Sequence, residues 1–317
     1  MRALITGATG FAGSHLTDHC LAEGWEVHGT CLGADLRAPA IPGLTRHSVD
    51  LRDADAVRAV VARTQPDRVF HLAAQASVAA AWADPAKTLT DNLVMTLRVL
   101  DAVRLETPGA RVLVVGSSEE YGSVEPECFP VVESQELRPV DPYGVSKVAC
   151  DLLAQQHFLA FGTHVVRVRP FNQLGPRQRR GFVLPDFAAG IVAIERGAAP
   201  VLKVGNLNSA RDFTDVRDVV RAYRLMLELG EPGAVYNVCS GTTVRIGALL
   251  DILIGASSVP IRIELDPART RPIDRPATVG SYAALHAATG WTPEIPITRT
   301  VLDTLAYWRA ELVHQAQ

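Results

Sequence analysis

The sequence lacks the features that mark several large classes of protein. No apolar run reaches the roughly 18–20 residues that a membrane-spanning helix needs. The apolar segment at residues 3–6 is too short for a secretory leader, because Gly7 interrupts it. An excess of positive charge is missing as well, since 31 Lys and Arg residues face 34 Asp and Glu residues. We therefore expect no membrane span and no nucleic-acid partner.

Disulfide and metal motifs are also missing. The five cysteines are odd in number, widely spaced, and form no CxxC pair. We therefore expect reduced, mostly buried thiols in a cytoplasmic protein. His15 and His19 stand four residues apart on a predicted helix, but no third ligand accompanies them, so we expect no metal site.

The first half of the chain alternates apolar segments with helical patterns. Strands are predicted at residues 3–6, 26–31, 68–72, 111–115 and 163–168. Helices are predicted at residues 11–23, 53–63, 85–105 and 142–161. This alternation predicts an α/β fold with a doubly wound parallel sheet, and 317 residues that are 48% hydrophobic can bury its core.

A glycine-rich loop joins the first predicted strand to the first predicted helix. In this context its glycines allow a tight turn, the approach of a pyrophosphate, and close packing of helix on strand. The helix N-terminus adds free N–H groups and a positive dipole end. We therefore predict a nicotinamide dinucleotide site that includes Gly7, Thr9, Gly10, Phe11 and Gly13.

The second predicted strand has no acid at its end, where NAD sites usually place one to hold the ribose 2′-hydroxyl. Arg37 lies nearby and could contact a 2′-phosphate, so NADP(H) is favoured and NAD(H) stays possible. Thr30, in this strand, is a further candidate for a cofactor contact. Asp50 and Leu51 end a third, short predicted strand, where Asp50 is placed to meet the adenine.

Tyr143 and Lys147 carry the predicted chemistry. They lie four residues apart on the helix predicted at 142–161, so they share one face of it. A lysine beside a tyrosine favours the phenolate and lowers the tyrosine pKa, which makes a general acid/base. Ser117 closes the buried strand upstream, where its hydroxyl can hydrogen-bond a substrate carbonyl or carbinol.

These motifs together resemble the extended short-chain dehydrogenase/reductase family. The glycine loop, His71-Leu72-Ala73-Ala74-Gln75, the segment Gly116–Gly122 and the YxxxK helix carry this resemblance. Segments 169–172, 211–216 and 271–274 resemble the nucleotide-sugar members of the family, so the match covers essentially the whole chain. In texture the chain is most similar to GDP-4-keto-6-deoxy-D-mannose reductases, with GDP-mannose 4,6-dehydratases as near relatives.

The resemblance implies a role for each matched residue. Ser117, Tyr143 and Lys147 would be catalytic, with Tyr143 transferring a proton at the sugar C4 oxygen and Lys147 binding the nicotinamide ribose. Glu119 is a further catalytic candidate. The cofactor would also contact Leu72, Ala73, Ala74 and Pro170. The substrate would contact Gln75, Ser77, Ser118, Glu119, Asn172, Val183, Lys203, Arg211, Arg271 and Asp274, with the two arginines gripping the diphosphate.

The resemblance also implies a domain plan and an assembly. Residues 1–170 would form a dinucleotide-binding Rossmann domain, which a later strand at 235–238 rejoins. Residues 171–317 would mainly form a smaller sugar-nucleotide-binding lobe at the carboxyl edge of the sheet. A homodimer would form through a four-helix bundle of the helices at 85–105 and 142–161. A UDP- or CDP-sugar is less favoured than a GDP-sugar.

The implied reaction is reduction of the C4 ketone of a GDP-4-keto-6-deoxyhexose, giving GDP-D-rhamnose or its C4 epimer. Glu119 keeps a GDP-mannose 4,6-dehydratase or a nucleotide-sugar 4-epimerase open, because in the dehydratases a Glu at this place removes the C5 proton. A non-catalytic dinucleotide sensor is a further alternative. Two departures from the family pattern are Gln173, where many relatives have His, and the basic loop at 176–180.

Overall fold

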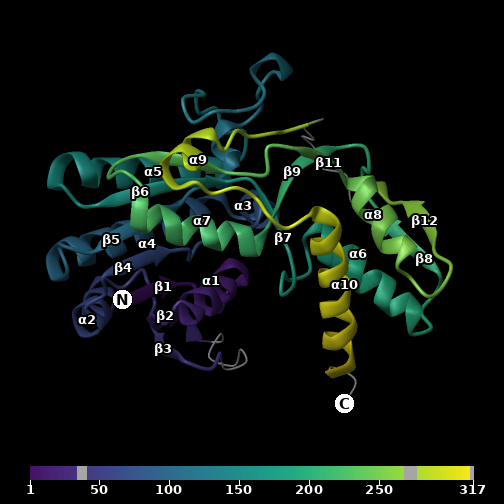
Figure 1. The fold of residues 1–317 in the computed structure, drawn as a ribbon, viewed down its shortest axis with the longest axis horizontal. Coiled ribbons are helices and arrows are strands. Elements are labelled where there is room, and N and C mark those ends of the chain that lie inside the picture. Colours follow the sequence, from purple (N-terminus) through teal and green to yellow (C-terminus); the bar gives the residue numbers. More distant parts are fainter. Residues whose placement is uncertain (34–40, 268–276, 315–317) are drawn as a thin grey trace.

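The structure is a computed structural model that describes residues 1–33, 41–267 and 277–314. Seven parallel strands form its central sheet, in the order β10-β6-β5-β4-β1-β2-β3 (Figure 1). The strands are β1 (Arg2–Thr6), β2 (Glu26–Cys31), β3 (Leu44–Ser48), β4 (Arg68–His71), β5 (Arg111–Val115), β6 (Val165–Pro170) and β10 (Val235–Val238). The strand order reverses between β1 and β4, and open α/β sheets bind ligands at such a switch point.

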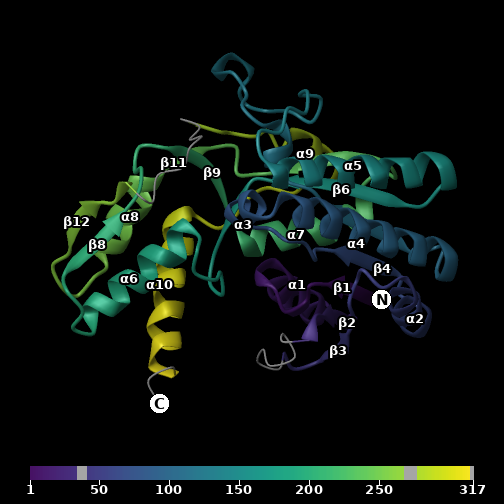
Figure 2. The ribbon, with the colours of Figure 1, turned by 180° about the vertical axis from the view of Figure 1, so that it is seen from behind.

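Helices cover both faces of this sheet (Figures 1 and 2). One face carries α1 (Phe11–Ala22), α7 (Val216–Leu229) and α9 (Ala283–Thr289), whose apolar side chains share a core with β1, β4, β5, β6 and β10. The other face carries α2 (Ala54–Thr64), α4 (Pro85–Glu106) and α5 (Pro142–Phe161), which pack on the opposite sides of the strands. Both faces being covered explains the uninterrupted apolar texture of strands such as β5.

Three of these helices begin at an aspartate that accepts backbone N–H groups. Asp53 caps α2, Asp84 caps α4, and Asp141 caps α5. A proline in the first turn of α4 and of α5 removes one N–H that would have no partner within the helix. Such local signals explain why the predicted helix bounds lie close to the observed ones.

A second, smaller core lies beyond the carboxyl ends of the strands (Figure 1). It contains α6 (Val183–Glu195), α8 (Ile246–Gly255) and α10 (Ile297–His314). A three-stranded sheet of β7 (Asn172–Leu174), β9 (Ala210–Asp215) and β11 (Thr243–Arg245) and a pair of β8 (Val201–Val204) and β12 (Arg262–Leu265) complete this lobe. Short elements are α3 (Val78–Ala83) and the 3-10 turns η2 (Ser118–Tyr121) and η3 (Pro126–Cys128).

The predicted α/β fold with a parallel sheet is confirmed, and one local expectation is corrected. The third strand ends at Ser48 and does not reach Asp50 and Leu51. A turn begins at Asp50, whose carbonyl accepts the Asp53 N–H, and this turn leads into α2. Four of the five cysteines are buried and all five are free. Among the described residues, no helix is both long and apolar enough to cross a membrane.

Helix α1 packs against the turn after β1 at Gly13, where the two backbones lie very close together. A Cβ atom at this position would collide with the carbonyl oxygen of Gly7. An alanine elsewhere in a helix usually stabilises it relative to glycine. At Gly13 the collision is with backbone, which cannot move away cheaply, so the sign of the effect reverses.

We therefore predict that Gly13→Ala lowers the free energy of unfolding by about 1–3 kcal/mol, the usual cost of overpacking. Gly109→Ala is the matched control, because a Cβ there meets no atom within 4 Å. Its effect should stay within about 0.5 kcal/mol. Urea unfolding followed by circular dichroism measures both. Equal unfolding midpoints for the two variants would contradict this account of α1 packing.

Candidate active site

The glycine loop after β1 has the shape of a phosphate-binding turn. Gly7 has a φ of +70°, which favours glycine, and Gly10 begins α1 without a side-chain cap. No acidic residue lies in the first turn of α1 to oppose an anion. A Cβ built on Gly10 would meet only the Gly7 carbonyl oxygen, at 3.1 Å. The loop therefore leaves its backbone open to a pyrophosphate, with Thr9 and Phe11 beside it.

The loop after β4 lies against this turn. Thr6, at the end of β1, accepts the N–H groups of Leu72 and Ala73, each at 3.1 Å. A Cβ on Gly7 would lie 3.1 Å from the Ala73 Cα. The predicted cofactor contacts Leu72, Ala73 and Ala74 are thus held beside the glycine loop. This arrangement is compatible with a dinucleotide that crosses the carboxyl ends of β1 and β4.

Of the residues predicted near the adenosine of the cofactor, the structure describes Thr30, Asp50 and Leu51. Thr30 is buried in β2, and Arg37 lies outside the described residues. Asp50 receives the Arg52 guanidinium at 2.9 and 2.7 Å, and this pairing lowers the pKa of its carboxyl to about 2. The Leu51 side chain is buried in the core beside α2. Of Leu51, only the backbone therefore remains available to an adenine.

Tyr143 and Lys147 are held on the first turns of α5. The carboxylate of Asp141 accepts the Gly144 N–H at 2.8 Å and so fixes the start of the helix. Lys147 donates to the carbonyl oxygen of Val115 at 2.7 Å, which joins α5 to the end of β5. The Lys147 Nζ lies 5.9 Å from the centre of the Tyr143 ring. Both side chains are buried.

Burial controls the ionisation of this pair. It raises the pKa of Tyr143, while a hydrogen bond with the Ser117 hydroxyl lowers it and the charges of Glu119, Glu120 and Asp141 raise it further. Burial also lowers the pKa of Lys147. We expected Lys147 to dominate and to lower the Tyr143 pKa, but desolvation of the phenol is the larger effect here. Burial therefore favours the neutral, protonated phenol as the resting form of Tyr143.

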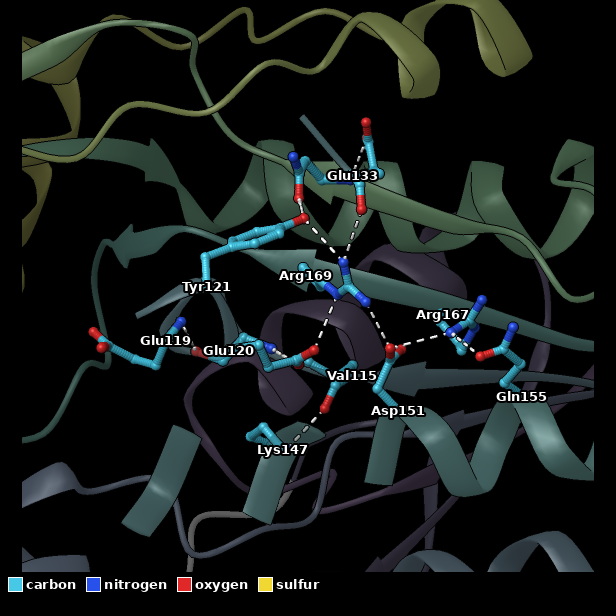
Figure 3. Close-up of polar contacts among 12 residues, drawn as sticks. Val115, Glu119, Glu120, Tyr121, Glu133, Lys147, Asp151, Gln155, Arg167 and Arg169 are labelled. Atoms are coloured by element: carbon cyan, nitrogen blue, oxygen red, sulfur yellow. Dashed lines mark hydrogen bonds and ion pairs between the residues drawn. The ribbon is translucent and has the colours of Figure 1, made fainter. Parts of the chain in front are cut away.

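Ser117 lies at the end of β5 and caps η2. Its hydroxyl oxygen accepts the Glu119 N–H at 3.1 Å. Ser118 is buried beside it, whereas the Glu119 side chain is half-buried and points away from the charges around Arg169 (Figure 3). The structure thus brings Ser117, Tyr143 and Lys147 together at the carboxyl end of β5. Pro170 ends the neighbouring strand β6.

Asn92 is a buried polar residue of the site that the sequence analysis missed. Its carboxamide oxygen accepts the Gln75 N–H at 2.8 Å, and its amide donates to the Gln75 carbonyl and to Ser146 Oγ at 3.2 and 2.9 Å. It therefore joins α4, α5 and the loop after β4. The sequence could have indicated Asn92 only as a polar residue on the buried face of a long helix.

The predicted substrate contacts divide into two groups. Gln75 holds its own turn, donating to the Ser77 carbonyl and to Thr88 Oγ1 at 3.0 Å each, and Ser77 caps α3. Ser118 and Glu119, in η2, belong to the same group. Four further contacts lie in the lobe: Asn172 on β7, Val183 on α6, Lys203 on β8 and Arg211 on β9. Arg211 donates to the Ala210 carbonyl at 2.8 Å. Arg271 and Asp274 lie outside the described residues.

Both departures from the family pattern have partners inside the chain. Gln173 donates from its carboxamide to the Tyr223 hydroxyl at 3.1 Å. In the basic loop, Arg177 pairs with Asp18 on α1. The described residues contain no group of three or more His, Cys, Asp or Glu side chains that could hold a metal ion.

Comparison with known proteins agrees with this geometry. The family model described as GDP-mannose 4,6 dehydratase matches residues 4–304. A GDP-6-deoxy-D-mannose reductase from Pseudomonas aeruginosa is 37% identical over 314 residues, which cover 98% of each chain.

Solved structures give the same picture. The structure of RMD from Pseudomonas aeruginosa in complex with NADPH is 36% identical, with a TM-score of 0.85 over 98% of this chain and 99% of that one. UDP-glucose 4-epimerase from Thermus thermophilus in complex with NAD is 30% identical, with a TM-score of 0.87 over 98% and 99% of the two chains. The chain therefore belongs to the GDP-mannose 4,6-dehydratase family of extended short-chain dehydrogenases/reductases.

Proposed function

We propose that this chain is an NADPH-dependent reductase that acts on the C4 ketone of a GDP-4-keto-6-deoxyhexose. One observation carries the proposal: Ser117, Tyr143 and Lys147 lie together as a buried acid–base group, in a chain 37% identical along its length to a GDP-6-deoxy-D-mannose reductase. The product would be GDP-D-rhamnose or its C4 epimer. Residues 1–170 would bind the dinucleotide, and residues 171–317 would mainly bind the sugar nucleotide.

Ser117, Tyr143 and Lys147 form the acid–base group, and each of them has one task in the proposed reaction. The dinucleotide, when bound, supplies the hydride that C4 receives. Tyr143 donates its phenolic proton to the C4 oxygen, and Ser117 donates a hydrogen bond to the same oxygen. Lys147 favours the negative charge that this transfer leaves on Tyr143. The carbonyl gains one hydride and one proton, and so becomes a carbinol.

NADP(H) is the favoured cofactor, and NAD(H) stays possible. The described end of β2 carries no carboxylate that would repel a 2′-phosphate. One similar structure holds NADPH and another holds NAD. The glycines at 7, 10 and 13 fit either dinucleotide, because both share the pyrophosphate.

A 4,6-dehydratase is the second candidate function, and Glu119 is the observation that favours it. Its carboxylate is partly exposed, follows Ser117 by two residues, and would suit the abstraction of a C5 proton. A 4-epimerase fits the same cofactor and acid–base group. A non-catalytic sensor is less well supported, because Ser117, Tyr143 and Lys147 lie together as an acid–base group.

We further propose a homodimer built on α4 and α5. The exposed apolar side chains of Val145, Leu152 and Leu159 recur every seven residues and form one stripe along α5. Helix α4 packs beside α5 (Figure 2). It adds the exposed apolar side chain of Leu93. Two copies of this helix pair would make a four-helix bundle. The buried free thiols support a cytoplasmic location.

Tyr143→Phe should keep the fold and the cofactor affinity while lowering kcat by about 10²–10⁴-fold, the usual contribution of one positioned acid. The matched control is Tyr236→Phe, which removes a buried hydroxyl that accepts the Glu231 N–H outside the site. Steady-state NADPH oxidation measures both variants. Near-normal turnover of Tyr143→Phe would remove this residue from the mechanism.

A reductase and a dehydratase differ in their net use of cofactor. We predict that the protein makes no 4-keto-6-deoxy product from GDP-mannose, and that it oxidises one NADPH for each 4-keto-6-deoxy sugar it reduces. Glu119→Gln should cost much less activity than Tyr143→Phe, because no C5 proton is abstracted. Dehydration of GDP-mannose without net cofactor consumption, abolished by Glu119→Gln, would establish the second candidate instead.

The dimer proposal has its own test. Replacing both Leu152 and Leu159 by aspartate should give a monomer, because four charges would then meet in the bundle. Leu229→Asp, at the exposed end of α7, is the control and should leave the dimer intact. Size-exclusion chromatography with light scattering reports the mass. A wild-type chain that is already monomeric at micromolar concentration would contradict the proposal.

A further inference from the structure

A cluster of four buried charges lies behind the active site, and we call Glu120, Asp151, Arg167 and Arg169 the buried charge cluster (Figure 3). None of these residues is more than 6% exposed. Arg169 donates to Glu120 at 2.9 Å and to Asp151 at 2.7 Å, and Arg167 donates to Asp151 at 3.1 Å. Buried charges are expensive unless each is paired, and here each one is.

Glu120 connects this cluster to Ser117. One carboxylate oxygen accepts the Ser117 N–H at 2.7 Å, and the other accepts the Arg169 Nε–H. Both oxygens are therefore committed, and the carboxylate is buried away from any substrate. A Cβ on Gly116 would collide with this carboxylate, so the glycine leaves the space that Glu120 occupies.

Arg169 connects the same carboxylate to α5. Its second carboxylate partner, Asp151, lies one turn after Lys147 on the helix that carries Tyr143. Its remaining nitrogen donates to the Tyr121 hydroxyl and to the Glu133 carbonyl, each at 3.2 Å. The guanidinium is thus fixed from several sides, and its contact with Glu120 cannot shift freely.

We propose that Glu120 is a positioning residue, which holds Ser117 in register with Tyr143 and Lys147 and whose negative charge acts on both of these groups. The proposal deepens the reductase assignment and rests on it. The rate effect would come from geometry, because a displacement of about 1 Å in an active site can cost up to about a hundredfold in rate.

The charges around the pair give the expected pH dependence. Tyr143 faces Glu119, Glu120 and Asp141, whose negative charges raise its pKa. Lys147 faces Cys150 and Glu120, which raise its pKa against the lowering effect of burial, and neutral His71 lies nearby. Removing the Glu120 charge therefore lowers the pKa of both groups. Both changes move the loss of activity at high pH to lower pH.

Burial and the charge of Asp151 raise the pKa of the Glu120 carboxyl to about 7, although Arg169, the Ser117 N–H and Lys147 oppose this shift. The hydrogen bonds from Ser117 and Arg169 favour the ionised form, in which neither carboxylate oxygen carries a proton. Glu120→Gln keeps only one acceptor atom, since its carboxamide offers one acceptor oxygen and one donor nitrogen. This variant must give up one of the two contacts.

The test compares Glu120→Gln with Asp151→Asn, an equally buried carboxylate of the same cluster that does not touch Ser117. For Glu120→Gln we expect kcat to fall about ten- to a hundredfold. KM should change less than about twofold, because no substrate contact is lost. The alkaline limb, which is the loss of kcat at high pH, should move to lower pH. Asp151→Asn should leave the alkaline limb in place. An unmoved limb in Glu120→Gln, with kcat within about twofold of the wild type, would overturn the proposal.

A second variant separates position from charge. Gly116→Ala keeps the carboxylate but displaces it, so kcat should fall with the alkaline limb unmoved. It also serves if Glu120→Gln fails to fold, because normal turnover in Gly116→Ala would contradict positioning through this contact.

Hydrogen exchange followed by mass spectrometry tests the contact without any substrate. The segment at residues 116–122 should exchange faster in Glu120→Gln than in the wild type or in Asp151→Asn. Unchanged exchange there would overturn the positioning role. A wild type that does not reduce the sugar would instead overturn only the proposed function.

Discussion

The arrangement of this active site depends on one buried guanidinium. Arg169, on β6, donates hydrogen bonds to the carboxylates of Glu120 in the turn after β5 and of Asp151 on α5. It also donates to the Tyr121 hydroxyl and to the Glu133 carbonyl. Leaving any buried charge of this set unpaired costs several kcal/mol, of the order of 3–5. The end of β5, the helix α5 and strand β6 are therefore constrained relative to one another, and the first two carry the proposed acid–base residues.

Burial then gives the acid–base group its character. Removal of Tyr143 from water raises the pKa of the phenol, and removal of Lys147 from water lowers the pKa of the ammonium. Both shifts favour the neutral forms, and the charges of Cys150 and Glu120 oppose the second of them. A neutral phenol that is hydrogen-bonded to Ser117 suits proton donation to a developing alkoxide.

Local signals predicted much of the fold, because strand texture, capping aspartates and the glycine loop act over a few residues. The bounds of β5 and α5 agree with the sequence, and so does the placement of Tyr143 beside Lys147. The short strands of the lobe were not predicted, since β7 and β11 have three residues each and are defined by their partners. Arg167 and Arg169 alternate with valines as on a half-exposed strand, and only Asp151 and Glu120, distant in sequence, explain why both are buried.

The central claim is that these residues deliver a proton to a C4 oxygen while the cofactor reduces C4. A single turnover with NADPH deuterated at its transferable position, and GDP-4-keto-6-deoxymannose as acceptor, tests it most directly. The account predicts that NMR of the purified product shows one deuterium at C4 of the sugar, and that Tyr143→Phe slows its appearance. A product without deuterium at C4, or no sugar alcohol at all, would contradict it.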